Sequence, residues 1–169
     1  GGTFRHRLTN KSGSINNGNF SGRFILEGGA VNDGEFAASA EIELNGGTVY
    51  GGIYYGNVKF GGADIKESAY RYVTFNTGGG SEISTQKILR GQKAAAPDEK
   101  PAKKGYIFGG WSAFDFTAPV LENTEITAQW TVCDHSGSTA KPTCTDSAIC
   151  SECGETAAAV GHQPKAGYM

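Results

Sequence analysis

A short turn-and-strand motif recurs through the first 69 residues and limits what this part of the chain can form. Each copy has a turn pair of Asn and Gly, or equivalent residues, followed by a short strand of β-branched or aromatic residues. Gly and Asn adopt positive φ at little cost, and the residues that follow suit a pleated surface. The copies lie at residues 16–22, 32–36, 45–51 and 55–61. Their spacing shortens along the chain, so the pattern predicts repeated short strands without a strict period.

Two β architectures fit this pattern. One is a short right-handed β-helix, in which each coil stacks its inward side chains on the next. The other is a β-meander of hairpins, for which Asn-Gly is a strong signal. Alternating apolar residues in 41–44 and 57–60 favour the β-helix. The predicted inward residues are Phe20, Phe24, Leu26, Val31, Phe36, Ile42, Leu44, Val49, Ile53, Val58, Phe60 and Ile65.

A second β pattern occupies residues 71–130. Val73 and Phe75 alternate with polar residues, and Ile126, Ala128 and Trp130 do so at the far end. Between them, residues 105–111 form an aromatic strand in which glycines permit close backbone approach. Pro97 and Pro101 make a long helix between residues 94 and 104 unfavourable. The segment therefore predicts a compact, strand-rich module.

This segment resembles the Listeria–Bacteroides repeat, also called the internalin B-repeat. The resemblance is carried by four features in a fixed order: Val-Thr-Phe-Asn76 before Gly78-Gly79-Gly80, then Gly91-Gln92, then Pro101 before Lys104-Gly105-Tyr-Ile-Phe-Gly-Gly-Trp111, then Ile126-Thr-Ala-Gln-Trp130. It implies a small β-grasp-like fold of secreted and wall-attached bacterial surface proteins, without catalytic residues. Residues 1–69 are similar in composition to Gly-rich adhesin repeats.

Composition divides the chain into three zones, because glycine is concentrated before residue 70 and cysteine is confined to the last 37 residues. We expect a mainly β protein with a β-helix-like part at 1–69, a β-grasp-like module at 70–131 and a small Cys-rich tail at 132–169. No Gly/Ser linker separates the first two zones, so we expect them to pack together. The second zone is then expected to cover the last coil of the β-helix, whose edge is otherwise open.

Charge and hydropathy exclude several partners. A net charge of −2 favours neither nucleic acid nor an acidic membrane surface. No apolar run approaches the roughly 20 residues that a membrane-spanning helix needs. The chain opens inside a Gly-rich pattern without an initiator Met, which we interpret as a section of a longer secreted protein.

The tail has too few apolar residues to bury a core, so an ordered tail needs a cross-link. Cys150-Ser-Glu-Cys153-Gly154 has the spacing of a zinc knuckle, in which a turn directs two thiolates at one tetrahedral ion. Cys133 and Cys144 complete a four-cysteine set, with His135 and His162 as alternative ligands. The predicted cofactor is therefore zinc.

Two alternatives to zinc stay open. An even number of cysteines in a secreted chain also fits two disulfides, and four cysteines allow three pairings. Thiols in an unstructured tail are the third interpretation. Residues 143–162 resemble one copy of a Cys-x-x-Cys-Gly…Gly-His repeat of clostridial-type surface proteins, which implies a surface location and no chemistry.

Catalytic signals are weak, so we expect no enzyme. The three histidines lie at position 6 and in the tail, and no nucleophile–base pattern surrounds them. Glu41 and Glu43 share one side of a strand, as glycosidase carboxylates can, but a solvated strand face explains them better. The predicted function is a non-enzymatic stalk or adhesive section of an extracellular, cell-surface or wall-attached bacterial protein, contacting host or cell-wall glycan or protein. The alternatives are a fragment of a carbohydrate-active β-helix enzyme and a structural spacer without ligand.

Overall fold

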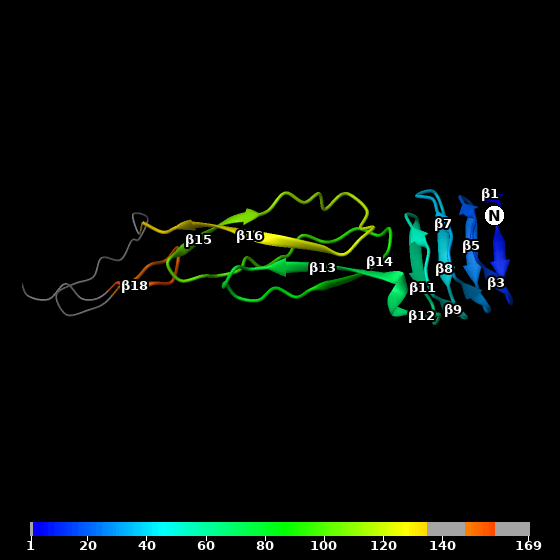
Figure 1. Ribbon diagram of the computed structural model, residues 1–169, viewed down its shortest axis with the longest axis horizontal. Coiled ribbons are helices and arrows are strands. Elements are labelled where there is room, and N and C mark those ends of the chain that lie inside the picture. The colour runs from blue at the N-terminus through cyan, green and yellow to red at the C-terminus, as the bar shows by residue number, and fades with distance from the viewer. Residues whose placement is uncertain (1, 135–147, 158–169) are drawn as a thin grey trace, which may run out of the picture. The chain divides into compact units, whose positions relative to one another are not determined.

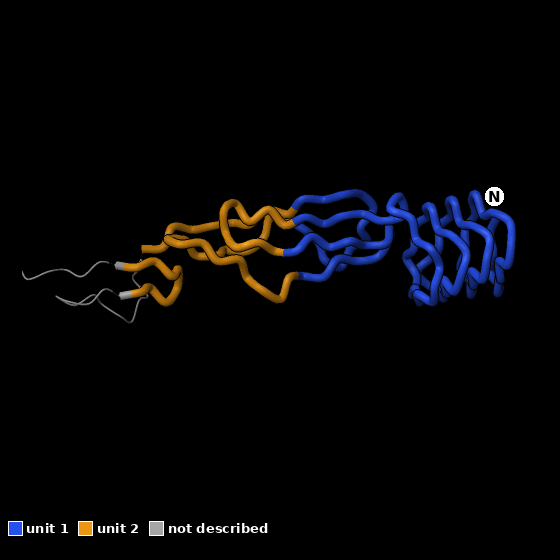
Figure 2. The backbone as a smooth tube through the Cα atoms, turned by 90° about the horizontal axis from the view of Figure 1, so that it is seen from below, with its two compact units in different colours: residues 1–74, 84–96, 114–125 blue, residues 75–83, 97–113, 126–169 orange. Residues whose placement is uncertain are grey.

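The computed structural model describes residues 2–134 and 148–157. These residues form an almost entirely β structure, which confirms the predicted fold class. The chain divides into two compact units (Figure 2): unit 1 comprises residues 1–74, 84–96 and 114–125, and unit 2 comprises residues 75–83, 97–113 and 126–169.

Unit 1 begins with a β-solenoid of four coils, each with three short strands (Figure 1). Equivalent strands of successive coils pair in parallel and form three four-stranded ladders. The coils are β1 (Thr3–Phe4), β2 (Leu8–Asn10) and β3 (Ser14–Ile15); β4 (Asn19–Phe20), β5 (Arg23–Leu26) and β6 (Ala30–Val31); β7 (Glu35–Phe36), β8 (Glu41–Leu44) and β9 (Thr48–Val49); β10 (Ile53–Tyr54), β11 (Asn57–Phe60) and β12 (Asp64–Ile65).

The strand register corrects the shortening period expected from the motif copies. The first ladder pairs Thr3 with Asn19 and Asn19 with Glu35, steps of 16 residues, and then Glu35 with Ile53, a step of 18. The longer step comes from the third coil, where residues 37–40 form a wider turn closed by the Ala40 N–H donating to the Ala37 carbonyl at 2.8 Å. The Asn-Gly turn at residue 45 therefore lies at a different corner of the coil from the turns at residues 16 and 32.

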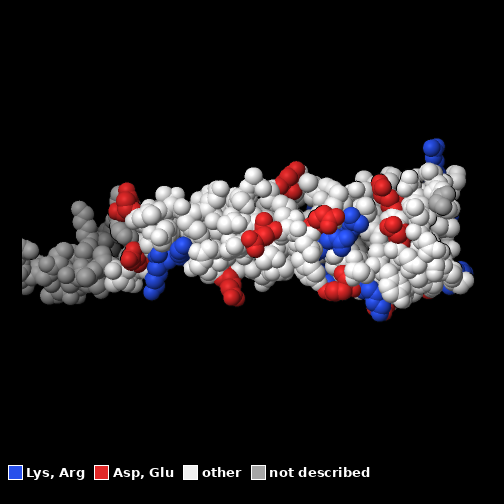
Figure 3. Space-filling view, in the orientation of Figure 1, with Lys and Arg blue, Asp and Glu red and all other residues white. Residues whose placement is uncertain are grey.

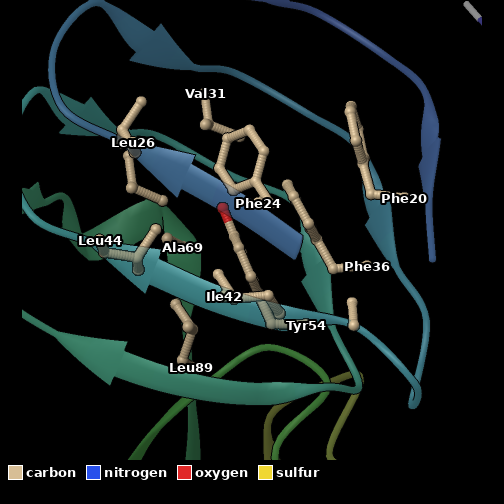
Figure 4. Close-up of a cluster of buried hydrophobic side chains, with 12 residues drawn as sticks. Phe20, Phe24, Leu26, Val31, Phe36, Ile42, Leu44, Tyr54, Ala69 and Leu89 are labelled. Carbon is tan, nitrogen blue, oxygen red and sulfur yellow. The ribbon is translucent and has the colours of Figure 1, made fainter. Parts of the chain in front are cut away.

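Aromatic stacking dominates the solenoid core (Figure 4). Phe4, Phe20, Phe36 and Tyr54 occupy one column, with ring centroids 4.9, 4.7 and 4.6 Å apart and nearly parallel planes. Phe24 packs against this column at a tilt, 4.9 Å from Phe36. Such contacts add about 0.5–1.5 kcal/mol per pair to the effect of burial.

Most of the predicted inward residues are buried, and two are corrected. Phe60 pairs with Leu44 in the parallel ladder but is 60% exposed, because β11 is the edge strand of that ladder. Ile53 is only half-buried, and its neighbour Tyr54 is the core residue of β10. Tyr54 keeps its hydroxyl satisfied by donating to the Gly51 carbonyl at 2.9 Å. Burial raises the pKa of this phenol, which therefore stays neutral.

One glycine column is required by the tight stacking of coils. Gly13, Gly29 and Gly47 all have φ between 71° and 79°, in the left-handed region. A Cβ added at Gly29 would lie 2.2 Å from the Gly13 carbonyl oxygen, and one at Gly47 would lie 2.5 Å from that of Gly29. Glycine is needed at positions 29 and 47 both for φ and for space, and at position 13 for φ alone.

The last coil is covered by residues that follow the solenoid in unit 1, as expected. The 3-10 helix η1 (Glu67–Ala69) and strand β14 (Gln86–Leu89) add Ala69 and Leu89 to the solenoid core. The Tyr54 N–H donates to the Arg90 carbonyl at 2.8 Å, and Gln92 Nε2 donates to the Gly56 carbonyl at 2.9 Å. The outer edge of β10 is therefore paired.

The second predicted module contains one four-stranded sheet with the order β14-β13-β16-β15. The other strands are β13 (Tyr70–Asn76), β15 (Tyr106–Trp111) and β16 (Thr124–Val132). In chain order this is 2-1-4-3, with the first and last strands at the centre, as in a β-grasp sheet. Val73 and Phe75 are buried on β13, and Ile126 and Ala128 on β16, as their alternation predicted.

Within unit 2, aromatic residues of β13, β15 and β16 pack on one another. Trp111 lies 5.1 Å from Phe75 and 5.2 Å from Phe108, and Phe108 lies 5.6 Å from Trp130, ring centroid to ring centroid. The β15–β16 register shifts between Phe108 and Gly110, so the strand carries a bulge. The β16 strand continues through Val132, one residue beyond the predicted end of this module at 131.

The distribution of charged side chains on the surface agrees with the small net charge of −2. Acidic and basic side chains are interspersed over the face shown in Figure 3. In the described part of the chain, no helix has the length and apolar character to cross a membrane.

Candidate metal centre

The three described cysteines of the tail come from the end of β16 and from one small hairpin. Cys133 directly follows β16, and its N–H donates to the Gly105 carbonyl at 2.9 Å. The hairpin pairs β17 (Ala148–Ile149) with β18 (Thr156–Ala157). Its turn carries Cys150 and Cys153, and Gly154 at φ 68° closes the turn by donating to the Cys150 carbonyl at 2.9 Å. The Cys-x-x-Cys-Gly segment therefore forms a tight turn that carries both cysteines.

The sulfur atoms lie at metal-binding distances. The Sγ atoms of Cys133, Cys150 and Cys153 are all within 4.8 Å of one another, and those of Cys133 and Cys150 are 3.8 Å apart. Two thiolates bound to one tetrahedral zinc at about 2.3 Å have sulfurs about 3.8 Å apart. The three side chains are 4–8% exposed and form their own small buried cluster. These three cysteines can therefore hold a metal ion.

The other predicted ligands lie outside the described residues. Cys144, His135 and His162 belong to residues 135–147 and 158–169. The structure thus brings together three of the four predicted cysteines. A carboxylate also lies beside the cluster, since Glu152 Oε2 is 3.9 Å from the Cys133 sulfur.

The carboxylate pair on β8 does not resemble a catalytic pair. Glu43 accepts a hydrogen bond from Arg23 Nη2 at 2.6 Å, and this bond holds the pKa of Glu43 below its usual value. A general acid of a glycosidase needs a raised pKa. Glu43 is instead a charged ion-pair partner on the outer face of the solenoid, with Glu41 exposed beside it.

A groove in unit 2 was missed by the sequence reasoning. Its volume is about 580 Å³, and it runs between the loop before β15, the strands β15 and β16, and the hairpin turn that carries Cys153. The aromatic strand expected at residues 105–111 contains two of its aromatic residues, Tyr106 and Phe108, but no pattern in the sequence indicates that residues 151–154 lie beside them. Its complete lining is Lys100, Pro101, Ala102, Lys103, Tyr106, Ile107, Phe108, Trp130, Ser151, Glu152, Cys153 and Gly154.

Comparison with known proteins identifies one segment of the chain. Residues 72–133 match the family model of the Listeria-Bacteroides repeat domain. The family predicted for this module is therefore confirmed, and the match indicates a surface-protein module. No curated protein and no solved structure matches the chain. The resemblances of the flanking segments to other surface repeats remain predictions.

Proposed function

We propose that this chain is a non-enzymatic stalk section of an extracellular bacterial cell-surface protein. The observation that carries the proposal is the Listeria-Bacteroides repeat at residues 72–133, a family typical of bacterial surface proteins. The solenoid supports a structural role, because its ladders and its aromatic column continue through all four coils. The contacts from Arg90 and Gln92 to the last coil join the two sequence zones without a flexible linker.

Two experiments test this role. An antibody against the chain is expected to label intact cells of the source bacterium, and labelling that requires permeabilised cells would contradict an extracellular location. Incubation of the purified chain with a panel of polysaccharides is expected to release no reducing ends above a heat-inactivated control. Reproducible turnover of one polysaccharide would establish the carbohydrate-active alternative.

We further propose that the metal of the tail is zinc. Three buried thiol ligands at tetrahedral spacing are the support, since thiolates favour zinc over harder cations such as calcium and magnesium. The fourth ligand is expected to be Cys144, with His135 and His162 as the alternatives. Bound in this way, zinc would give the tail the cross-link that its few apolar residues cannot replace.

Intact mass measurement identifies the ion. Under native conditions the chain is expected to carry one zinc, which a chelator removes. Denatured without reductant, it is expected to keep its fully reduced mass, whereas a deficit of about two mass units per bridge would show disulfides instead. The fourth ligand is identified by the variant that loses zinc among Cys144→Ser, His135→Ala and His162→Ala.

A further inference from the structure

The groove of unit 2 has the dimensions and lining of a small-ligand site. Its volume of about 580 Å³ lies within the usual range of ligand sites, roughly 300–1,000 Å³. Apolar and aromatic side chains form most of its walls, with a few charged groups among them. Nothing in the stalk role requires such a groove.

The aromatic wall is held in a fixed position. Trp130 donates its indole N–H to the Thr77 carbonyl at 2.9 Å, and its ring is packed against Gly80, where an added Cβ would come within 2.7 Å of the indole. Phe108 packs edge-on against the same ring at 5.6 Å. Tyr106 and Trp130 both remain half-buried on the groove. Half-buried aromatic rings offer an apolar surface on which the C–H face of a pyranose can stack.

A lysine ammonium is fixed between the two rings. Lys103 Nζ lies 4.4 Å from the Tyr106 ring centroid and 5.7 Å from that of Trp130, and it donates to the Gly78 carbonyl at 2.8 Å. An ammonium has three N–H donors, so two remain for groups entering the groove. Lys100 adds a second cation on the same wall. Positive charge placed this way suits a carboxylate, with which ammonium groups form strong hydrogen bonds.

We propose that this groove binds an acidic saccharide. A carboxylated pyranose packs against the part of the aromatic wall at Tyr106, Phe108 and Trp130 that Lys103 leaves uncovered, and directs its carboxylate to Lys103 and Lys100. Glu152, on the hairpin side, accepts hydrogen bonds from sugar hydroxyls. The assignment adds a binding activity to the stalk role and is independent of which metal the cysteines hold.

Titration with tetragalacturonate tests the proposal, with tryptophan fluorescence and calorimetry as readouts on the full chain. Saturable binding is expected, with a change in indole emission from Trp130. Lys100→Gln and Lys103→Gln are each expected to weaken binding about 10-fold or more, as loss of a charge-assisted hydrogen bond does. Lys104→Gln is the matched control, because this neighbouring lysine is exposed and does not line the groove.

Three outcomes would overturn the assignment. The first is the absence of saturable binding at millimolar tetragalacturonate. The second is equal binding of neutral maltotetraose, which would remove the role of the carboxylate. The third is undiminished binding by the Lys100→Gln variant. Lys100 is exposed, so its replacement leaves the fold intact.

Discussion

The solenoid and the cysteine tail order short β-strands by opposite means. In the solenoid, two- to four-residue strands are held by parallel neighbours and by a column of stacked aromatic side chains. In the tail, the strands of the hairpin are only two residues long, and the buried cluster described beside them consists of three cysteines. Repetition lets each coil bury its side chains on the next, whereas a single hairpin has no such neighbour, and the proposed ion would supply its cross-link. The stability of the first region is thus distributed over its coils, and with the proposed ion that of the second would be concentrated in one site.

The largest expected effect comes from removing one tail ligand. Cys150→Ser is expected to abolish stoichiometric zinc, because a structural zinc site contributes on the order of 10 kcal/mol and depends on all its ligands. Metal analysis after gel filtration measures this loss. Ser151→Ala, an exposed substitution in the same turn, is the control and is expected to retain one zinc. Equal zinc in both variants would refute a role for Cys150.

Truncation of the aromatic column is expected to have the next largest effect. Phe36→Ala removes a fully buried ring that contacts Phe20, Phe24 and Tyr54, and should lower the free energy of unfolding by about 3–5 kcal/mol. Chemical denaturation followed by circular dichroism measures the change. Phe60→Ala, at a site 60% exposed, should stay within about 0.5 kcal/mol of the parent. A similar decrease in the free energy of unfolding for both variants would show that the aromatic column is not the core of the solenoid.

In the glycine column, the cost in stability of the left-handed φ can be measured separately from the cost of the space that an added methyl group needs. Gly13→Ala meets no atom within 4 Å and should cost about 1 kcal/mol for its left-handed φ alone. Gly29→Ala has almost the same φ but meets the Gly13 carbonyl at 2.2 Å, so overpacking raises its cost to about 2–4 kcal/mol. The melting temperatures of the two variants test the stacking distance. Equal decreases relative to the parent would argue against coils packed this closely.

The smallest expected effect is a pH dependence from Glu43. Its hydrogen bond with Arg23 lowers its pKa in the folded state, so the stabilisation is present above the unfolded pKa of about 4.3 and is lost as the pH falls through the lowered value. The melting temperatures of the parent and of Glu43→Gln should therefore converge as the pH is lowered from 7 to 3. Glu41→Gln, on the same strand, is the control. A constant gap at all pH values would contradict the ion pair.

Local patterns predicted the fold well where they were repeated or alternating. The inward positions of β8, Ile42 and Leu44, followed from alternation alone. The coil length did not, because a two-residue enlargement at residues 37–40 moved later turns out of phase. The sequence pattern favours Ile53 over Tyr54 as the inward residue, because the aromatic column that Tyr54 joins is visible only once the register is known.

The candidate site was predictable only in part. The Cys-x-x-Cys-Gly spacing indicated a knuckle, because a tight turn dictates where both sulfurs point. Cys133 was a candidate by composition, and it joins the cluster because β16 ends beside the hairpin in unit 2. The groove could not be foreseen, since it needs Lys103 and Trp130, far apart in sequence, on the same side of the sheet.

Hydrogen exchange measured by mass spectrometry, with and without a zinc chelator, tests the contrast between the two regions most directly. The predicted result is that amides of residues 148–157 lose their protection when the metal is removed, while those of the solenoid strands between residues 19 and 60 keep theirs. Unchanged protection of residues 148–157, or a parallel loss in the solenoid, would contradict the account.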